Sequence, residues 1–574
     1  MTSSDVSAPS ASQPASDASW LEYWGAAIAV SLAMFIAVID STLMNVAIPA
    51  IVADLDTTVT VVQGAITFYA LVMAALILPG GRLPSLYGVR RMMTVTLVVY
   101  GVGTLLAAVS WNATVLYVGW SVIEGAAAAV LLPLTFTVLI VGYEGRDRAK
   151  ALGILAGVNA AGAAIGPLLG GALTTFASWR WGFALEAVVV LVALLFVRYL
   201  PAGTTSGPRE RFDLGGTVLS VVAMTVLVAG ILLAGRYGWL LPRRPFVVAG
   251  VTLDLFGTSP TVWLVGAGLL VFAAFIQYER RVERAGGSPL VPMGVLANAG
   301  FTGGVVTNAV RSVVLAGFLF IVPVFLQSGA GFTAFQTGLA LLPFSVATFV
   351  GSIFTTGWRA RVQPRTLIQV GTVLMGLGTV SLASRTSLDV TVVELVLPMT
   401  LFGLGLGLIM AQLLDLTLSS VDEADSSAAS GVLNATAMLG YSFGTAVVGA
   451  FLLSRFYGGV VDGVLSASGT TVSADRREAL VVALQDAAET ATRETQQALL
   501  AQLSPAEQDL VRGVLDAAIV EAQTASVLLL ALLVLVVLLS TVFLPDAQPS
   551  SPPDASYDTT EAPASGGDDP SGGD

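Results

Sequence analysis

The chain has 574 residues, of which 55% are hydrophobic and only 11% are charged, and its formal net charge is −12. Its mean hydropathy of +0.83 is outside the range of soluble globular domains, so the composition predicts a polytopic membrane protein. The chain has no cysteine and no histidine, which excludes disulfides, thiol catalysis, zinc sites built from those ligands and imidazole proton relays. Any proton chemistry must therefore use Asp, Glu or Tyr.

The two ends of the chain are polar. Residues 1–21 are rich in Ser, Ala and Pro and lack the basic start and apolar core of a cleavable signal. Residues 545–574 are acidic and rich in Gly, Pro and Ser. Both segments have too few apolar residues to build a core, so we expect disordered tails.

Between the tails, apolar runs of about twenty residues recur, each long enough to cross about 30 Å of hydrocarbon. Unpaired backbone groups cannot face lipid, so runs of this length must be helices. We count fourteen, at residues 24–44, 60–80, 93–111, 115–139, 152–174, 181–200, 214–235, 261–278, 301–325, 336–356, 366–384, 391–413, 427–453 and 525–544.

Basic residues in the short loops predict the orientation of these helices. If the N-terminus is cytoplasmic, the inner loops hold most of the loop arginines; the outer loops keep only Arg180, Arg236, Arg243, Arg244 and Arg385. Positive residues concentrate on the cytoplasmic side, so we expect both termini to be cytoplasmic and the protein to lie in the cytoplasmic membrane.

This orientation places residues 454–524 outside the membrane. Ser504, Pro505 and Glu507 have the spacing of a capping box with proline at the first helical position, so we expect short amphipathic helices there. We favour an insert without a role in transport over a functional lid.

The fifth apolar run contains the string "GAAIGPLLGGAL". It places Gly162, Gly166, Gly170 and Gly171 around Pro167. Small residues four apart allow a neighbouring helix to approach closely, and the proline removes one backbone bond and bends the axis. Ordinary helix packing explains any single pair of such glycines, but the whole string is more specific.

This string resembles the antiporter signature of drug:proton antiporters in the major facilitator superfamily. Other motifs of the branch with fourteen spans follow in order: residues 40–49 resemble its first-span pattern, 178–183 its entry to the sixth span and 429–434 its entry to the thirteenth. The segment 81–91 is similar to the inner-loop gating motif of the superfamily, through Gly81, Gly88, Arg90 and Arg91. The similarity covers about residues 22–453.

The resemblance implies an all-α membrane fold of two six-helix halves with two extra central helices. Its expected boundaries are 22–200 for the N-terminal half, 201–278 for the linker with helices 7 and 8, 279–453 for helices 9 to 13, 454–524 for the outer insert and 525–544 for helix 14.

Three positions in two motifs depart from the family pattern. The inner-loop motif usually has an acidic residue where this chain has Ser85, and the fourth span usually has an arginine at the position of Ser121 and a glutamine at that of Glu124. A buried cation is thus replaced by a buried acid, which changes how protonation is coupled.

Asp40 interrupts the first apolar run, where a charge costs about 2.5 kcal/mol or more. From the expected span ends, Asp40 lies about seven residues from the outer end of its helix and Glu124 about nine from its own, or roughly 10 and 14 Å. An apolar environment penalises an ionised carboxyl and a second acid nearby adds repulsion, which favours proton exchange. We predict that Asp40 and Glu124 couple protons; the alternative is that Asp40 is a structural hydrogen-bond acceptor and Glu124 faces a watery cavity passively.

Further polar and aromatic side chains inside the spans are candidates for a substrate cavity. Arg311 lies in the middle of the ninth span one turn after Asn308, and a buried guanidinium requires a partner or an aqueous cavity. The full set of cavity candidates is Glu186, Asn159, Asn308, Arg311, Phe318, Gln327, Asn434 and Tyr441. For each of the uncharged ones, ordinary packing is the competing interpretation.

Taken with the resemblance, these features predict a proton-driven exporter of amphipathic or cationic compounds that works by alternating access. The alternative is a transporter of the same fold for a single metabolite or lipid-like substrate. We expect small-molecule substrate, protons and lipid as partners, no cofactor, metal or nucleic acid, and a monomer. An enzyme or a channel is disfavoured, because no nucleophile with a base, nucleotide loop or selectivity filter is recognisable.

Overall fold

A computed structural model describes residues 20–143, 145–200, 212–248, 251–253, 256–291, 293–358, 362–421, 426–490 and 502–545. The predicted tails lie outside these residues apart from 20, 21 and 545. Nearly all of the described chain is helical. A short antiparallel hairpin of β1 (Phe246–Val248) and β2 (Val251–Leu253) pairs Phe246 with Leu253 and Val248 with Val251.

Thirteen helices in the described ranges are long and apolar enough to cross a membrane, and α6 is a further long helix with a shorter apolar half. Together they account for the fourteen predicted spans and confirm the all-α membrane fold. The helices are α1 (Trp20–Asp54), α2 (Val59–Tyr87), α3 (Val89–Ala108), α4 (Ala113–Leu116), the π-helix η1 (Tyr117–Glu124), α5 (Gly125–Gly142), α6 (Gly145–Phe176), α7 (Arg180–Phe196), η2 (Val197–Tyr199), α8 (Leu214–Tyr237), α9 (Pro260–Arg284), α10 (Met293–Ala297), α11 (Ala299–Ser328), α12 (Ala334–Trp358), α13 (Pro364–Ala383), α14 (Val392–Leu418), α15 (Ser426–Ala467), α16 (Ala474–Thr490), α18 (Pro505–Ser540) and η4 (Thr541–Phe543).

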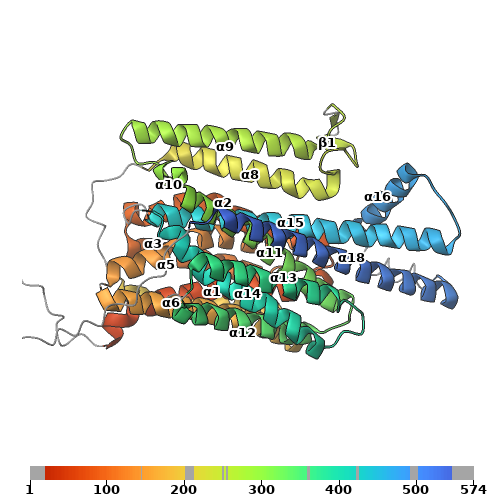
Figure 1. Ribbon diagram of the computed structural model, residues 1–574, viewed down its shortest axis with the longest axis horizontal. Coiled ribbons are helices and arrows are strands. Elements are labelled where there is room, and N and C mark those ends of the chain that lie inside the picture. Colours follow the sequence, from red (N-terminus) through yellow and green to blue (C-terminus); the bar gives the residue numbers. More distant parts are fainter. Residues whose placement is uncertain are drawn as a thin grey trace, which may run out of the picture.

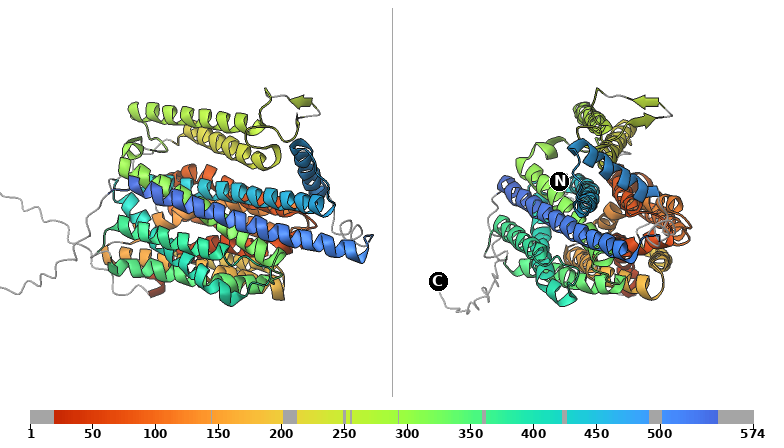
Figure 2. Two further views of the ribbon diagram at one scale, coloured as in Figure 1. Left: turned by 45° about the vertical axis from the view of Figure 1, so that its right-hand side comes forward. Right: turned by 90° about the vertical axis from the view of Figure 1, so that its right-hand side faces the viewer.

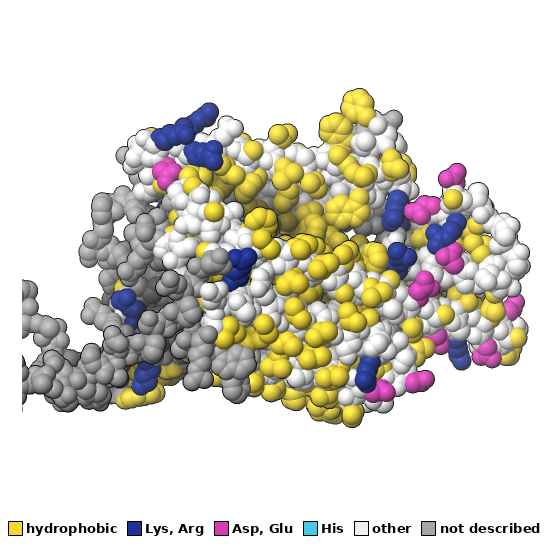
Figure 3. Space-filling view, in the orientation of Figure 1, with side chains coloured by type: hydrophobic (Ala, Val, Ile, Leu, Met, Phe, Trp, Pro, Cys, Tyr) yellow, Lys and Arg dark blue, Asp and Glu magenta, His cyan; other side chains and the backbone are white. Residues whose placement is uncertain are grey.

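The long helices run side by side in one bundle, with α8 and α9 as a pair along one edge (Figure 1; Figure 2). Helix α8 packs on α9 and touches α2 and α15, so the pair meets one helix from each half. Apolar side chains cover the middle of the visible face, and most of the visible acidic ones gather at the end that carries α16 (Figure 3). This distribution fits a bilayer around the middle of the bundle, and we call the end with α16 the outer end, following the predicted orientation.

Helix α1 is longer than expected and changes the position of Asp40. The helix continues through Pro49 to Asp54. Pro49 removes the N–H that would pair with the Asn45 carbonyl one turn earlier, and the adjacent Val46 carbonyl accepts from Gln327 at 2.8 Å. Asp40 therefore lies fourteen residues (54 − 40) from the outer end of α1, or about 21 Å, and the predicted depth of about seven residues was wrong.

The outer insert is built mainly from continuations of membrane helices. Helix α15 has 42 residues and α18 has 36, which gives lengths of about 63 and 54 Å. Helix α16 is one of the short helices that were expected. The capping box at Ser504 and Glu507 is present as predicted, but it begins the long helix α18 and not a separate short helix. Arg243 pairs with Glu478 at 3.2 Å and Arg244 pairs with Asp486, so the loop after α8 is tied to α16.

The two halves meet along two seams, α6 against α12 and α2 against α15. Near the outer end of the first seam, a Cβ at Gly338 would overlap the carbonyl oxygen of Pro167, and one at Gly171 would overlap that of Ala334. Near the outer end of the second, Gln63 donates to the Thr445 carbonyl at 2.8 Å. The halves are thus in close backbone contact at the outer end.

Candidate functional site

Three carboxyl groups from three helices meet inside the N-terminal half. Asp40 lies on α1, Glu124 is the last residue of η1 and Glu186 lies on α7. One oxygen of each lies within 4.8 Å of the others, and the side chains are 0%, 0% and 2% exposed. Asp40 and Glu124, predicted together as the proton-coupling acids, are neighbours, and Glu186, predicted as a cavity candidate, lies beside them.

The electrostatics of this carboxyl cluster limit its charge. At an effective dielectric constant of about 20, two unit charges at this spacing repel by about 3 kcal/mol. No ion pair within the described ranges involves any of the three acids. The cluster must therefore hold protons or a bound cation; carboxylate oxygens at this spacing also match the ligands of a hard cation such as Ca²⁺.

Neutral side chains supply the hydrogen bonds to the cluster. The indole of Trp120 donates to Asp40 at 2.7 Å, and the hydroxyl of Thr104 donates to Glu186 at 3.2 Å. The two oxygens of Glu124 receive no N–H or O–H donor in the described chain, although both are buried. Asp40 and Glu186 can therefore keep a negative charge more easily than Glu124 can.

The fourth span contains the π-helix that places Trp120 and Glu124. Runs of π-helix are rare and frequently occur at functional sites. Here η1 packs tightly on α3, because a Cβ at Gly103 would lie 2.7 Å from the backbone nitrogen of Glu124 and one at Gly119 would lie 2.8 Å from that of Ala107. Ser121, at the position where the family usually has arginine, donates to the Ala65 carbonyl of α2 at 2.8 Å.

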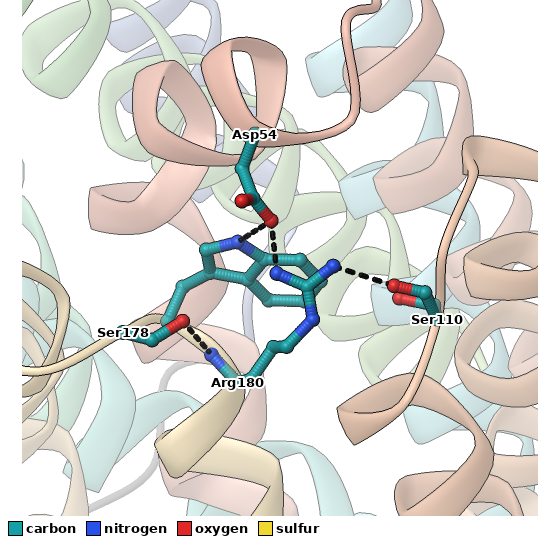
Figure 4. Close-up of polar contacts among 5 residues, drawn as sticks. Asp54, Ser110, Ser178 and Arg180 are labelled. Carbon is teal, nitrogen blue, oxygen red and sulfur yellow. Dashed lines mark hydrogen bonds and ion pairs between the residues drawn. The ribbon is translucent and has the colours of Figure 1, made fainter.

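A polar contact group joins two of the helices that carry the cluster, α1 and α7, to the end of α3 (Figure 4). Asp54, at the end of α1, accepts from the Trp179 indole at 3.1 Å and from the guanidinium of Arg180 at the start of α7. Arg180 also donates to the Ser110 carbonyl after α3 at 2.6 Å, and its backbone N–H donates to the Ser178 hydroxyl at 3.3 Å. The motif predicted as the entry to the sixth span thus joins α1, α3 and α7 above the carboxyl cluster.

Arg311 is buried in the C-terminal half with neutral partners. Its guanidinium donates to the amide oxygen of Asn308 at 2.8 and 3.2 Å and to the hydroxyl of Ser312 at 3.1 Å. Asn308 in turn donates to the Leu433 carbonyl on α15 at 3.1 Å. One nitrogen of the guanidinium, Nη1, is buried without a partner within the described chain.

The remaining cavity candidates fall into two groups. Gln327 and Tyr441 bridge the halves near the outer end: Gln327 donates to Val46, and the Tyr441 hydroxyl accepts from Asn45 at 3.2 Å. The other three make contacts within one half: Asn434 donates to the Ser430 carbonyl at 2.9 Å, Asn159 lies 3.6 Å from the Met34 sulfur, and Phe318 stacks on Phe402 with ring centroids 4.0 Å apart.

The glycines of the fifth-span motif act through close contact, as predicted. A Cβ at Gly166 would overlap the side chain of Thr42, and one at Gly170 would lie 3.0 Å from the backbone of Leu43, so these residues allow α6 to approach α1.

At the inner loop, Gly88 has φ 85°, a conformation that favours glycine, and it joins α2 to α3. Arg90 and Arg91 follow it in the first turn of α3.

Four members of the site were not predicted as proton-site residues. Trp120 and Thr104 donate to the acids, while Tyr69 stacks on Trp120 with centroids 5.0 Å apart and Tyr100 lies beside Glu124. The signal in the sequence was weak, because aromatic and Thr residues are common in membrane helices. Only the spacing of Trp120 and Glu124, one turn apart on one helix, pointed to a shared site.

A bundle of membrane-length helices in two closely packed groups, with acids buried inside one of them, defines a secondary transporter. The sequence model described as "Major Facilitator Superfamily" matches residues 30–445. The chain therefore belongs to the Major Facilitator Superfamily, as the motifs predicted.

Relatives and solved structures agree with this assignment. A puromycin resistance protein from Streptomyces alboniger is 30% identical over 79% of this chain and 85% of its own length. The multidrug efflux pump LfrA from Mycolicibacterium smegmatis is 28% identical over 76% of this chain and 82% of its own length. The fold is similar to the crystal structure of a bacterial homologue of the human lysosomal transporter Spinster in an inward-facing conformation, with a TM-score of 0.60 and 14% identity over 93% of this chain and all of that one. The family relationship and these efflux relatives identify the chain as a transporter of the drug-efflux type.

Proposed function

We propose that this protein exports amphipathic or cationic small molecules across the cytoplasmic membrane in exchange for protons. The observation that carries the proposal is the carboxyl cluster of Asp40, Glu124 and Glu186, which is buried in a transporter fold without a positive partner in the described chain. Acids inside a membrane protein are costly and mark proton relays and ion pathways. Asp40 and Glu124 are the central proton-coupling residues in this proposal.

The exchange works by alternating access. Substrate binds from the inner side while carboxyls are ionised, the halves then open at the outer end, and protons from outside neutralise the acids and favour release. Closing of the outer seams, as at Gly338 against Pro167 and Gln63 against Thr445, returns the site to the inner side, where the protons leave. The two halves can separate at the glycine contacts without breaking an ion pair, which favours this cycle.

The proton gradient supplies enough free energy for useful export. Moving one net charge through about 100 mV supplies roughly 2.3 kcal/mol. At about 1.4 kcal/mol per tenfold change, this supports roughly a 50-fold substrate gradient. An electroneutral exchange would use the pH difference instead.

A second candidate function is the export of one antibiotic-like compound. It is favoured by the puromycin resistance protein among the relatives, whose name refers to a single compound, whereas LfrA is named as a multidrug pump. Transport of ethidium, puromycin and several unrelated dyes by the same preparation separates the two: a broad range supports the multidrug function, and a single transported compound supports the second.

The main test measures dye accumulation in inside-out vesicles that are acidified inside. We expect wild-type protein to accumulate ethidium in the vesicle lumen, and this accumulation to collapse in Asp40→Asn, in Glu124→Gln or in both, while protein level and dye binding persist. Asp462→Asn, which removes an acid from an ion pair outside the cluster, is the matched control and keeps wild-type transport. Normal pumping by both cluster variants would falsify the proton-site assignment.

We also propose cytoplasmic termini and a functional monomer. The arrangement of loop arginines supports the orientation. Protease accessibility of terminal tags in right-side-out and inside-out vesicles tests it, and transport by protein reconstituted at one copy per liposome tests the monomer.

A further inference from the structure

We propose that the carboxyl cluster provides two exchangeable proton positions, one at Asp40 and one at the Glu124–Glu186 pair, so that two protons are exchanged for each substrate molecule. The inference rests on the proposed function, because it specifies how many protons drive it. It also assigns Glu186 to the proton site as a full member.

Glu124 and Glu186 form a close pair within the cluster. One carboxyl oxygen of each lies within 4.8 Å of the other. Two ionised carboxylates at this spacing repel each other, so a proton on one of them stabilises the pair. Glu186 accepts from Thr104, whereas neither oxygen of Glu124 has a hydrogen-bond partner in the described chain. Glu186 is therefore the member of the pair whose ionised form is better stabilised, and Glu124 the one that keeps its proton.

Asp40 has a hydrogen-bond donor of its own. One oxygen of Asp40 accepts from Trp120, and its other oxygen is buried without a partner in the described chain. An ionised Asp40 thus has one strong neutral donor. The cluster thus contains two carboxyls, Asp40 and Glu186, whose ionised forms accept from a neutral donor, and one, Glu124, that has no such donor and keeps its proton.

The side chains around the cluster are neutral. Those that interact with its carboxyl groups are Tyr69 on α2, Tyr100 and Thr104 on α3, Trp120 on η1 and Tyr441 on α15. All are neutral, and no arginine or lysine forms an ion pair with the acids within the described ranges. Changes in charge must therefore come from protons or from a cationic substrate.

One transport cycle exchanges two protons through the cluster. In the loaded cluster all three carboxyls are protonated and the net charge is zero. On the inner side Asp40 and the Glu124–Glu186 pair each lose one proton to water, which leaves one proton shared within the pair and two negative charges. On the outer side two protons from water restore the loaded form. The second proton belongs to the pair as a unit.

The experiment measures the proton to substrate ratio in proteoliposomes. Ethidium accumulation is followed at several pH differences with the membrane potential held at zero. We expect the accumulation ratio of the wild type to rise about 100-fold per pH unit, as for two protons, and that of Glu186→Gln to rise about tenfold, as for one. Asp462→Asn is the control and keeps the wild-type slope.

A second measurement covers the case in which Glu186→Gln does not transport. A pH-indicator dye counts the protons released when ethidium binds to purified protein, and we expect the variant to release about half as many as the wild type. A tenfold slope in the wild type, or equal proton release from both proteins, overturns this inference and leaves proton coupling intact. Accumulation that ignores the pH difference and follows a sodium gradient overturns the proposed function as well.

Discussion

The two halves of the bundle bury charge in opposite ways. The N-terminal half holds three acids within 4.8 Å of one another, and the C-terminal half holds Arg311 with an amide and a hydroxyl as its partners. The acids can change charge by gaining protons, whereas a guanidinium keeps its charge. Two halves of similar architecture therefore need not share the same chemistry: one half holds acids that protons can neutralise, and the other holds a constant positive charge.

The largest expected effect comes from removing both proton positions of the N-terminal half. In the double variant Asp40→Asn with Glu186→Gln, neither donor-supported carboxyl remains, so we expect proton-driven ethidium export to fall to the level of empty vesicles. Glu186→Gln alone should retain the part of the activity that one proton drives. Transport in acidified vesicles measures this, and a double variant as active as Glu186→Gln alone would place the proton site elsewhere.

A smaller effect is expected at the seam that both halves share. In Gly338→Val the new side chain would overlap the Pro167 carbonyl, so the outer end of the seam cannot close. Because the chain has no native cysteine, a single Asn45→Cys reports opening through labelling by an impermeant maleimide from outside. We expect labelling to increase about tenfold, a shift of about 1.4 kcal/mol.

The control for this seam prediction is Gly266→Val, because a Cβ at Gly266 on α9 meets nothing within 4 Å. It should label like the parent protein. Equal labelling of both valine variants would show that the seam does not limit opening.

A third prediction tests whether the charges of the two halves act on each other. The pairing of Arg311 with neutral groups implies that it is no counter-ion of Asp40. We expect Asp40→Asn to change the ethidium Kd by the same factor in wild type and in Arg311→Met, with a coupling energy below about 0.5 kcal/mol. A double-mutant cycle of Kd values measures this, with Arg311→Lys as the charge-preserving control, and a clearly larger coupling energy contradicts the separation of the halves.

The smallest effect is expected at the outer contact group of the N-terminal half. Asp54→Asn removes the ion pair with Arg180, while the hydrogen bond from Arg180 to the Ser110 carbonyl remains. The side chains of Arg180 and Asp54 are 29% and 46% exposed. We expect a loss of stability of about 1 kcal/mol or less, seen as a small decrease in Tm, with transport retained. Asp56→Asn, at an exposed acid two residues away, is the control; a strong loss of transport in Asp54→Asn alone would give this contact group a role in the cycle.

The sequence predicted the membrane helices well because their signal is physical and local. A run of about twenty apolar residues has no alternative to a helix in lipid, and motifs such as the one around Pro167 identified close packing. The extent of α1 was misjudged because the expected span ended after about twenty residues, at residue 44, whereas the helix continues through Pro49 to Asp54. The length of an apolar run shows that a helix spans the membrane, but it does not fix where that helix ends.

The site was predicted in part for a related reason. Asp40 and Glu124 are conspicuous because acids are rare inside apolar runs. Their meeting with Glu186 depends on how α1, η1 and α7 are rotated, and that rotation comes from contacts such as Gly103 with Glu124 and Asp54 with Arg180. Periodicity along one helix does not contain this information.

The unbroken course of α15 and α18 has a practical consequence. Each helix is roughly twice the thickness of the hydrocarbon layer, so a tilt of its buried part carries the exposed part along with it. Arg243 and Arg244 pair with acids of α16 and so connect it to the loop after α8. A ligand that binds both elements would restrict the movement of the exposed helix ends. In the proposed orientation, we expect an antibody fragment that holds α16 against that loop to slow transport from outside the cell, without crossing the bilayer or competing with substrate.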